Sequence, residues 1–334
     1  MPKISAKKIS EITGFSPATV SNALNNKRGV NRETAEQILG VAKAHGYFGE
    51  EKIDFIRFVI YKDSGQVVSY DPFYSALIEG AQSEASASGR EMTITNLDKS
   101  SEDYITTLSR ILDDANSGLL ILATEMTEDD AKLFNKAIGP VVMLDNCFDN
   151  TIFNTVMHDN TDAMYKAVEH LITKGHHKIG YIKCDFRIKN FYYRETGYQR
   201  ALAAYNLPLN PRYIMSFSTK LDEVYSDMCR WLENTTELPT AFIADNDVYA
   251  LNAMKAFQKN GYRIPEDISI IGFDDLPMSS LSYPELTTIK VFNKDMGQVA
   301  VRRLNEIINY GDNLKTKIQV YNEFIERNSV RSIT

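Results

Sequence analysis

The chain has 334 residues, of which 43% are hydrophobic and 24% are charged, and its formal net charge at pH 7 is −7. This length predicts two or three domains with a buried core, and the acidic balance argues against a general nucleic-acid coat. No apolar stretch is long enough for a signal peptide or a membrane span, so we expect a cytoplasmic protein with no membrane partner.

The charge is unevenly distributed along the chain. Residues 1–50 contain seven Lys or Arg and four Glu, whereas the rest of the chain is strongly acidic. A small basic module therefore precedes a large acidic body. We expect attraction to phosphate to be localised near the N-terminus.

The first fifty residues predict three short helices, at 6–13, at 17–24 and after Asn31. Ser5, Ser16 and Asn31 are good N-caps, and Gly14 is a stop signal after the first helix. The apolar spacing predicts a shared core. Its expected members are Ile9, Ile12, Val20, Leu24, Ala35, Ile38, Leu39 and Ala42.

Two short helices joined by a glycine turn form a helix-turn-helix, whose second helix can enter the major groove of double-stranded DNA. The exposed face of the second helix carries small hydroxyl and amide side chains, which suit base edges and phosphates. These are Ala18, Thr19, Ser21, Asn22 and Asn25. The alternative is a three-helix bundle with a polar surface, and the basic charge and the caps favour DNA binding.

A specific resemblance begins at Ile9. The run ISEITGFSPATVSNALN at 9–25, followed by GVNRET at 29–34 and Gly46-Tyr47, resembles the headpiece of the LacI/GalR family of bacterial repressors. The resemblance implies base contacts from Pro17, Ala18 and Asn22. It implies phosphate contacts from Ser16, Thr19, Ser21 and Asn25.

Asn22 departs from the family pattern, which usually has arginine at this position. Arginine favours a bidentate contact to guanine, whereas asparagine favours adenine. We therefore expect an altered operator half-site.

The linker departs from the family as well. Members usually have a longer segment after the Gly-Tyr pair, and it includes a hinge helix that wedges into the minor groove and kinks the operator. Here a strand-like run begins at Phe55, and Glu50, Glu51 and Asp54 lie where DNA would come close. We expect the hinge helix to be shortened or absent.

From Phe55 onward, short apolar runs alternate with helical stretches, which is the rhythm of parallel, doubly wound sheets. The predicted strands are 58–61, 92–95, 119–123, 141–144, 179–183, 241–244 and 268–273. The predicted helices are 72–88, 101–114, 128–137, 159–174, 194–205, 221–234, 247–260 and 294–310. So many units predict two α/β lobes, with a ligand bound in the cleft between them.

Motifs along the body also resemble the family, in the expected order. They include DPFY at 71–74, RETGY at 194–198, ADND at 244–247 and, most specific, PEDISIIGFDD at 265–275. The resemblance implies the fold of type I periplasmic binding proteins. In that fold the chain crosses between the lobes three times, near 146–159, 291 and 324.

These observations predict an all-α helix-turn-helix headpiece at 1–48, a short atypical linker at 49–56, and an α/β effector-binding and dimerisation domain at 57–334. Two doubly wound lobes make up this domain. The expected N-lobe covers about 57–148 and 293–322, and the expected C-lobe covers about 159–290 and 325–334.

The resemblance also implies an effector site. The family's contacts fall on Phe73, Tyr74, Asp145, Asn146, Arg194, Asn246 and Asp274. Arginine offers five donors in a fixed fork, the carboxylates accept from hydroxyls, and an aromatic ring covers an apolar ring face. That combination suits a sugar or a related polyol. Structural roles stay open as well: the carboxylates as turn caps, the aromatics as core, and Arg194 as the partner of a structural acid such as Glu195.

Two other classes of protein were considered against this sequence. A solute-binding protein of a sugar transport system shares the two lobes, but the basic headpiece and the missing signal peptide argue against it. An α/β enzyme is disfavoured because no G-x-S-x-G, P-loop or G-x-G-x-x-G occurs. The five histidines and the three widely spaced cysteines, Cys147, Cys184 and Cys229, lack metal-ligand spacing, so we expect neither metal nor cofactor.

A single headpiece makes few contacts with DNA, so we expect a homodimer on a pseudo-palindromic operator. No heptad tail follows the body, and we expect no coiled-coil tetramer. The expected output is repression. A small effector, expected to be a carbohydrate, would change the angle between the lobes and hence the spacing of the two headpieces.

Overall fold

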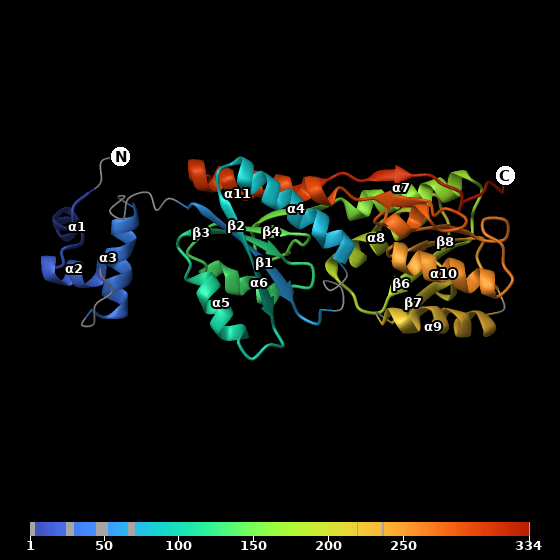
Figure 1. Ribbon diagram of the computed structural model, residues 1–334, viewed down its shortest axis with the longest axis horizontal. Coiled ribbons are helices and arrows are strands. Elements are labelled where there is room, and N and C mark those ends of the chain that lie inside the picture. The colour runs from blue at the N-terminus through green and yellow to red at the C-terminus, as the bar shows by residue number, and fades with distance from the viewer. Residues whose placement is uncertain are drawn as a thin grey trace. The chain divides into compact units, whose positions relative to one another are not determined.

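The computed structural model describes residues 4–24, 30–44, 53–65, 71–218, 220–235 and 237–333 (Figure 1). Contacts within the chain separate it into two units, Met1–Ile53 and Asp54–Thr334. We call the first unit the headpiece and the second the body, and describe each by itself. No helix among the described residues has both the length and the apolarity needed to cross a membrane.

Three helices form the headpiece: α1 (Ala6–Thr13), α2 (Pro17–Leu24) and α3 (Arg32–Ala44). The predicted caps are confirmed, because side-chain oxygens of Ser5, Ser16 and Asn31 each accept a hydrogen bond from the backbone N–H three residues later. Gly14 ends α1 in the left-handed conformation, with φ of 75°. These local signals depend only on neighbouring residues, which is why the sequence predicts them well.

The core of the headpiece contains the fully buried side chains of Ile9, Val20 and Ile38. The predicted burial of Ile12 and Leu39 is wrong, because these side chains are 45% and 38% exposed. In a bundle of three short helices, each helix turns only a narrow stripe toward its neighbours, and these two residues lie outside it.

The first lobe of the body is a parallel sheet with the strand order β11-β5-β4-β3-β1-β2. Its strands are β1 (Phe55–Lys62), β2 (Glu91–Asp98), β3 (Ser117–Leu122), β4 (Val141–Leu144), β5 (Asn154–His158) and β11 (Lys317–Val320). Helices α4 (Asp71–Ala87) and α11 (Asn293–Tyr310) pack on one face, and α5 (Tyr104–Leu112) and α6 (Glu128–Leu133) on the other. Because both faces are covered, strands β3 and β4 are buried along their whole length.

The second lobe is a smaller parallel sheet with the order β7-β6-β8-β9. Its strands are β6 (Ile179–Cys184), β7 (Ile214–Phe217), β8 (Ala241–Ala244) and β9 (Ser269–Ile271). Helices α7 (Asn160–Thr173) and α8 (Lys189–Ala204) pack on one face, and α9 (Leu221–Glu233) and α10 (Asp247–Lys259) on the other. Three short 3-10 helices lie at Phe134–Lys136, Pro211–Tyr213 and Pro277–Ser280.

The chain passes between the lobes from β5 to α7, from β10 (Thr288–Lys290) to α11, and from β11 to β12 (Glu323–Ile325). Strands β10 and β12 pair with each other in antiparallel fashion. After β12 the chain runs along the second lobe, where Ser329 exchanges hydrogen bonds with Ile270 and accepts one from the backbone of Thr287. Residues from far along the sequence therefore complete both lobes.

The expected fold of two doubly wound lobes is confirmed, and each predicted strand and helix overlaps one in the structure. Five short strands were not predicted: β5, β7, β10, β11 and β12. They have only three to five residues, several of them polar, so their own sequence carries little signal. Helix α8 begins at Lys189, earlier than predicted, which places Arg194 inside the helix and not at its start.

Two glycines allow α4 and α11 to pack closely. A Cβ atom on Gly80 would overlap the backbone carbonyl of Lys294, and one on Gly297 would overlap the carbonyl of Leu77. Each helix thus presses its backbone against a glycine of the other. This contact fixes the start of α4, where Tyr74 lies, relative to the second crossing between the lobes.

We expect Gly80→Ala to lower the free energy of unfolding of the body by about 1–3 kcal/mol, because the added methyl group forces the helices apart. Urea unfolding followed by circular dichroism measures this change. Unfolding at the wild-type urea midpoint would contradict the close contact.

Gly40→Ala is the matched control. Gly40 is also a helical glycine, in an exposed position of α3 where a Cβ would meet no atom within 4 Å. Because alanine favours helix, this variant should stabilise the headpiece by about 0.5–1 kcal/mol.

Candidate functional site

The predicted DNA-contact residues lie at the start and along the surface of α2. Ser16, Pro17, Ala18 and Ser21 are exposed, and Thr19 and Asn22 are half-buried. The hydroxyl groups of Ser16 and Thr19 lie 2.9 Å apart. Asn25 lies outside the described residues. Small polar side chains therefore cover the outward side of a capped helix, which suits insertion into a groove.

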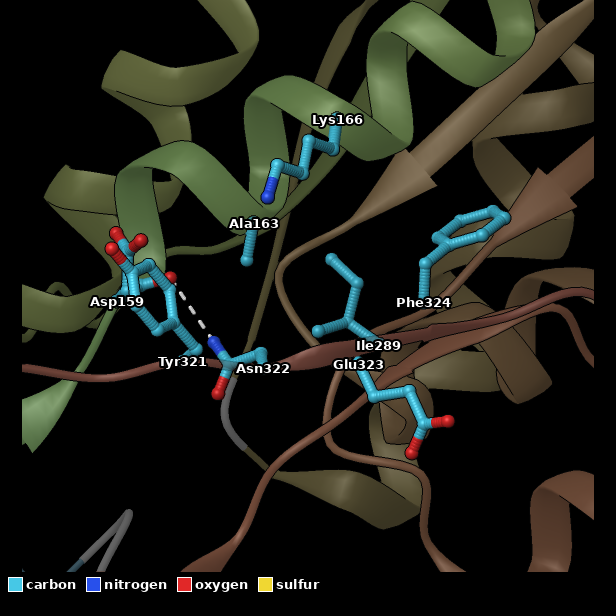
Figure 2. A pocket seen from close by; sticks show the side chains of 8 residues that line it. All are labelled: Asp159, Ala163, Lys166, Ile289, Tyr321, Asn322, Glu323 and Phe324. Carbon is cyan, nitrogen blue, oxygen red and sulfur yellow. Dashed lines mark hydrogen bonds between the residues drawn. The ribbon is translucent and has the colours of Figure 1, made fainter.

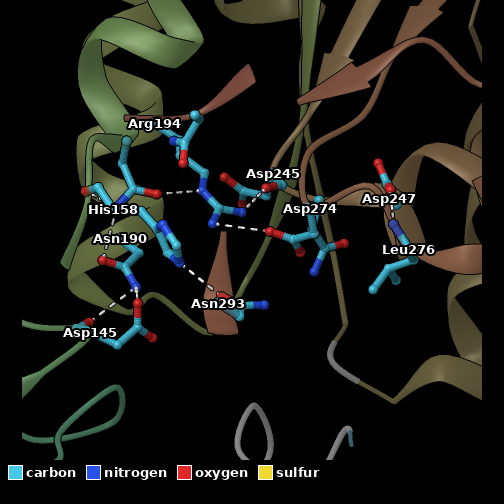
Figure 3. A network of polar contacts seen from close by, with 12 residues as sticks. Asp145, His158, Asn190, Arg194, Asp245, Asp247, Asp274, Leu276 and Asn293 are labelled. Carbon is cyan, nitrogen blue, oxygen red and sulfur yellow. Dashed lines mark hydrogen bonds and ion pairs between the residues drawn. The ribbon is translucent and has the colours of Figure 1, made fainter. Parts of the chain in front are cut away.

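In the body, Arg194 and Asp274 come together from α8 and from the segment after β9 (Figure 3). Arg194 Nη2 lies 3.3 Å from Asp274 Oδ1, and the two side chains are 4% and 11% exposed. Asp274 has a φ of 109°, and its backbone N–H donates to the carbonyl of Ile289. A non-glycine residue in this conformation is strained, and such strain is typical of functional sites.

Arg194 is surrounded by partners. Its Nε donates to Asn160 Oδ1 at 2.9 Å, and its Nη1 donates to the carbonyl of Asp245 at 2.5 Å. Its guanidinium carbon lies 3.7 Å from the centre of the Phe273 ring. Each Nη carries a second hydrogen that these bonds do not use, so the group can still donate to a ligand.

The acid that pairs with Arg194 is Asp274 and not Glu195. Glu195 does not pair with it and instead lies 2.9 Å from Arg187 and 3.4 Å from Lys183. Arg187 also pairs with the fully buried carboxylate of Asp245. This charged cluster is joined to Arg194 through Asp245, whose backbone carbonyl accepts from Arg194.

Asp145 connects the two lobes. It follows β4 with a φ of 61°, and its Oδ2 accepts from the hydroxyl of Thr124 in the first lobe at 2.7 Å. Its Oδ1 accepts from Asn190 Nδ2, on α8 of the second lobe, at 2.9 Å. Asn190 in turn accepts from Asn160, which binds Arg194. A continuous hydrogen-bonded path therefore joins Asp145 to Asp274 (Figure 3).

The carboxyl groups of this network have raised pKa values. Burial raises the pKa of Asp274 to about 7, against the opposing effect of Arg194, and the negative charges of Asp247 and Asp145 raise it further. Burial likewise raises the pKa of Asp145 to about 6, although its hydrogen bonds with Thr124 and Asn190 oppose the shift. The charge of the site therefore changes close to neutral pH.

The two predicted aromatic residues begin α4. Tyr74 is 7% exposed, and burial, with the neighbouring Asp145 carboxylate, raises the pKa of its phenol, while a hydrogen bond with Thr124 lowers it. The structure thus brings Tyr74 next to Thr124 and Asp145. Phe73 belongs to the same helix, but its side chain lies outside the described residues.

The two predicted asparagines have structural bonds. Asn246 is half-buried and caps α10, because its Oδ1 accepts from the backbone N–H of Tyr249 at 3.1 Å. Asn146 is 2% exposed, and its Nδ2 donates to the carbonyls of Ala123 and Met126. Asn246 retains surface that a ligand can reach, whereas Asn146 is enclosed.

Sequence reasoning missed several residues of this network. They are Thr124, Asn160, Asn190, Asp245 and Asp247. Asp247 accepts from the hydroxyls of Ser279 and Thr288 and from the backbone N–H of Leu276, and burial raises its pKa to about 6. Thr124, Asp245 and Asp247 each come soon after an apolar strand, a signal that could have been used. Asn160 and Asn190 gave no comparable signal, because their partners are distant in the sequence.

A separate small pocket lies beside the third crossing, between α7 and residues 321–324 (Figure 2). Its lining includes Lys166, Tyr321 and Glu323, and none of the predicted effector residues contributes to it. Within the described part of the chain, no group of three or more His, Cys, Asp and Glu side chains is placed to hold a metal ion.

Comparison with known proteins identifies the family. Residues 168–330 match the model of a periplasmic binding protein-like domain. The HTH-type transcriptional repressor PurR of Haemophilus influenzae (strain PittEE) is 30% identical over 333 residues, covering 98% of each chain. The PurR repressor of Mannheimia succiniciproducens is 28% identical, again covering 98% of each chain.

Solved structures share the fold over nearly the whole chain. The transcriptional regulator CelR in complex with cellobiose has a TM-score of 0.74 at 20% identity, covering 98% of this chain and 100% of its own. The lac repressor dimer bound to operator and the anti-inducer ONPF has a TM-score of 0.72 at 23% identity, covering 98% and 99%. The repressor relatives and the helix-turn-helix both argue against a transport protein. The chain therefore belongs to the LacI/GalR family and is a DNA-binding transcriptional regulator with a periplasmic-binding-protein-like body.

Proposed function

We propose that this regulator is a cytoplasmic repressor, and that a sugar or related polyol binds between the lobes of its body and controls operator binding. The observation that carries the proposal is the pair of Arg194 and Asp274. It sets a fixed donor beside a fixed acceptor, and neighbouring hydroxyl groups of a sugar need both. The pair is held in place by buried bonds, so a ligand would find it already oriented.

The predicted effector residues divide into two roles. We assign direct ligand contacts to Arg194, Asp274 and Asn246, because each has a donor, an acceptor or exposed surface beyond its structural bonds. We assign positioning roles to Asp145, whose two carboxylate oxygens bind Thr124 and Asn190, and to Asn146, whose amide group binds two backbone carbonyls. Phe73 and Tyr74 would cover an apolar face of the ligand.

The structural neighbours support a carbohydrate effector. One of them was solved with cellobiose, and a LacI family regulator from Enterococcus faecium was solved with bound ribose. The lac repressor was solved as a dimer on its operator, which supports a homodimer that presents two copies of α2 to a pseudo-palindromic site. No enzymatic role is proposed, since the curated relatives are repressors.

Ligand control would work through the path between the lobes. Asp145 and Asn190 belong to different lobes, and their hydrogen bond depends on the angle between them. A ligand that binds Arg194 and Asp274 more strongly at one lobe angle would shift the population toward that angle. The headpieces would then be held at a spacing that either fits or misses the two half-sites.

The first test is a thermal-shift titration with a panel of mono- and disaccharides. A ligand present at a hundred times its dissociation constant should stabilise the body by about 2.7 kcal/mol. The stabilisation should be lost in Arg194→Lys, because lysine cannot reproduce the fork of donors.

The matched control for this titration is Asp275→Asn. Asp275 is the next acid after Asp274, but it pairs with Arg327 at 2.6 Å and is not part of the network. This variant should keep the ligand response, whereas Asp274→Asn should lose it. A response that survives in Arg194→Lys and Asp274→Asn would place the ligand elsewhere.

Ionisation of Asp274 should lower the stability of the body as the pH rises from about 4 to about 7. Because burial raises the pKa of Asp274 from 3.8 to about 7, the folded chain binds more protons than the unfolded chain between these values. In Asp274→Asn this contribution is absent. We therefore expect the melting temperature of the variant, minus that of the wild type, to increase from pH 4 to pH 7. Above pH 7 this difference should stay constant. Parallel curves over this range would contradict the raised pKa.

The base preferred at one position of the operator half-site should depend on the residue at position 22. In a selection from random DNA, wild type should prefer adenine at a position where Asn22→Arg prefers guanine, because each side chain forms its own bidentate pair. A good pair contributes about 1–3 kcal/mol of discrimination. Identical preferred sites for both proteins would show that Asn22 does not read a base.

A further inference from the structure

Three successive backbone groups converge on the side chain of Glu125. This residue comes shortly after β3 and is 6% exposed. Its Oε2 accepts from the N–H groups of Asp63, Ser64 and Gly65 at 3.0, 3.0 and 2.8 Å. Consecutive N–H groups directed at one point form an anion-binding nest. We call residues 63–65 the β1 nest.

The β1 nest lies where a doubly wound sheet can bind a charged ligand. It follows the carboxyl end of β1, and Gly65 has the positive φ of 70° that closes such a turn. In related folds the turn after the first strand holds phosphate groups. Here a carboxylate of the same chain lies in that position.

The β1 nest also adjoins the proposed effector site. Glu125 directly follows Thr124, whose hydroxyl donates to the Asp145 carboxylate of that site at 2.7 Å. Lys99, which follows β2, contacts this loop and is also paired, because it binds both Asp63, at 3.1 Å, and Asp130, at 3.0 Å. The N–H groups of the nest and the Lys99 ammonium group are therefore already matched by carboxylates of the chain itself.

We propose that Glu125 is a specificity-determining residue. Its carboxylate fills the β1 nest as a built-in anion and excludes effectors that carry a phosphate group near Tyr74, so that the body selects uncharged sugars over sugar phosphates. The selection of uncharged sugars over sugar phosphates rests on the proposed function, whereas the filling of the nest by Glu125 does not.

The test uses inorganic phosphate and the full-length chain. Glu125→Ala removes the carboxylate that accepts from the three N–H groups of the nest, so that an added anion can take its place. Glu125→Gln is the matched control, because it keeps an oxygen acceptor of the same reach but carries no charge. Melting temperatures are measured as phosphate replaces chloride at constant ionic strength.

We expect phosphate to raise the melting temperature of Glu125→Ala in a saturable manner, by about 3 °C at ten times its dissociation constant. Wild type and Glu125→Gln should not respond, since an oxygen already fills the nest. The same rise in Glu125→Gln would overturn the proposal, because the loss of negative charge alone would explain it. A rise in wild type, or none in Glu125→Ala, would overturn it as well.

If Glu125→Ala is unfolded in chloride, this variant and Glu125→Ser are refolded in phosphate instead, and this also tests whether phosphate can replace the Glu125 carboxylate. Recovery of folded protein in phosphate but not in chloride supports the filled nest, and failure in both counts against it. The phosphate experiment contains no sugar, so its outcome does not depend on the proposed effector. If the sugar titration fails, the proposed effector is refuted and the filled nest is not.

Discussion

A guanidinium group can be buried only if acceptors surround it, and much of the body is arranged to meet that requirement at Arg194. The acceptors come from α7, from the end of β8 and from the segment after β9, and the ring of Phe273 covers one face. Elements that are far apart in the sequence are thereby held at one point.

The carboxyl groups around Arg194 have an electrostatic cost. Asp145, Asp247 and Asp274 are all buried enough to raise their pKa values toward neutrality, although Asp145 and Asp247 each accept several hydrogen bonds and Asp274 accepts one from Arg194. A ligand hydroxyl that donates to Asp274 would lower that cost. Sites that bind polar ligands commonly give up stability in this way, because the charges needed for recognition are unfavourable while the ligand is absent.

The sequence predicted those parts of the fold that depend on neighbouring residues. The caps at Ser5, Ser16 and Asn31 and the alternation of strands and helices follow from local patterns, and the structure contains them. The short strands were missed because each is placed by the strand it pairs with and not by its own residues: β5 pairs with β4, β11 with β5, β7 with β6, and β10 with β12.

The candidate site could be predicted only in part. Arg194 and Asp274 were picked out by their motifs, and the structure brings them together. Asn160 and Asn190 join them through bonds that span 30 to 45 positions of sequence, and no local pattern reports such a distance.

The route of residues 317–333 affects the order in which the parts of this regulator become functional during synthesis. Strand β11 completes the first sheet beside β5, and Ser329 lies along β9 in the second, so neither lobe is complete until that region has left the ribosome. The headpiece forms from the first fifty residues, and chains grow at about 5–20 residues per second. A nascent chain therefore acquires its DNA-reading helix well before it can respond to an effector.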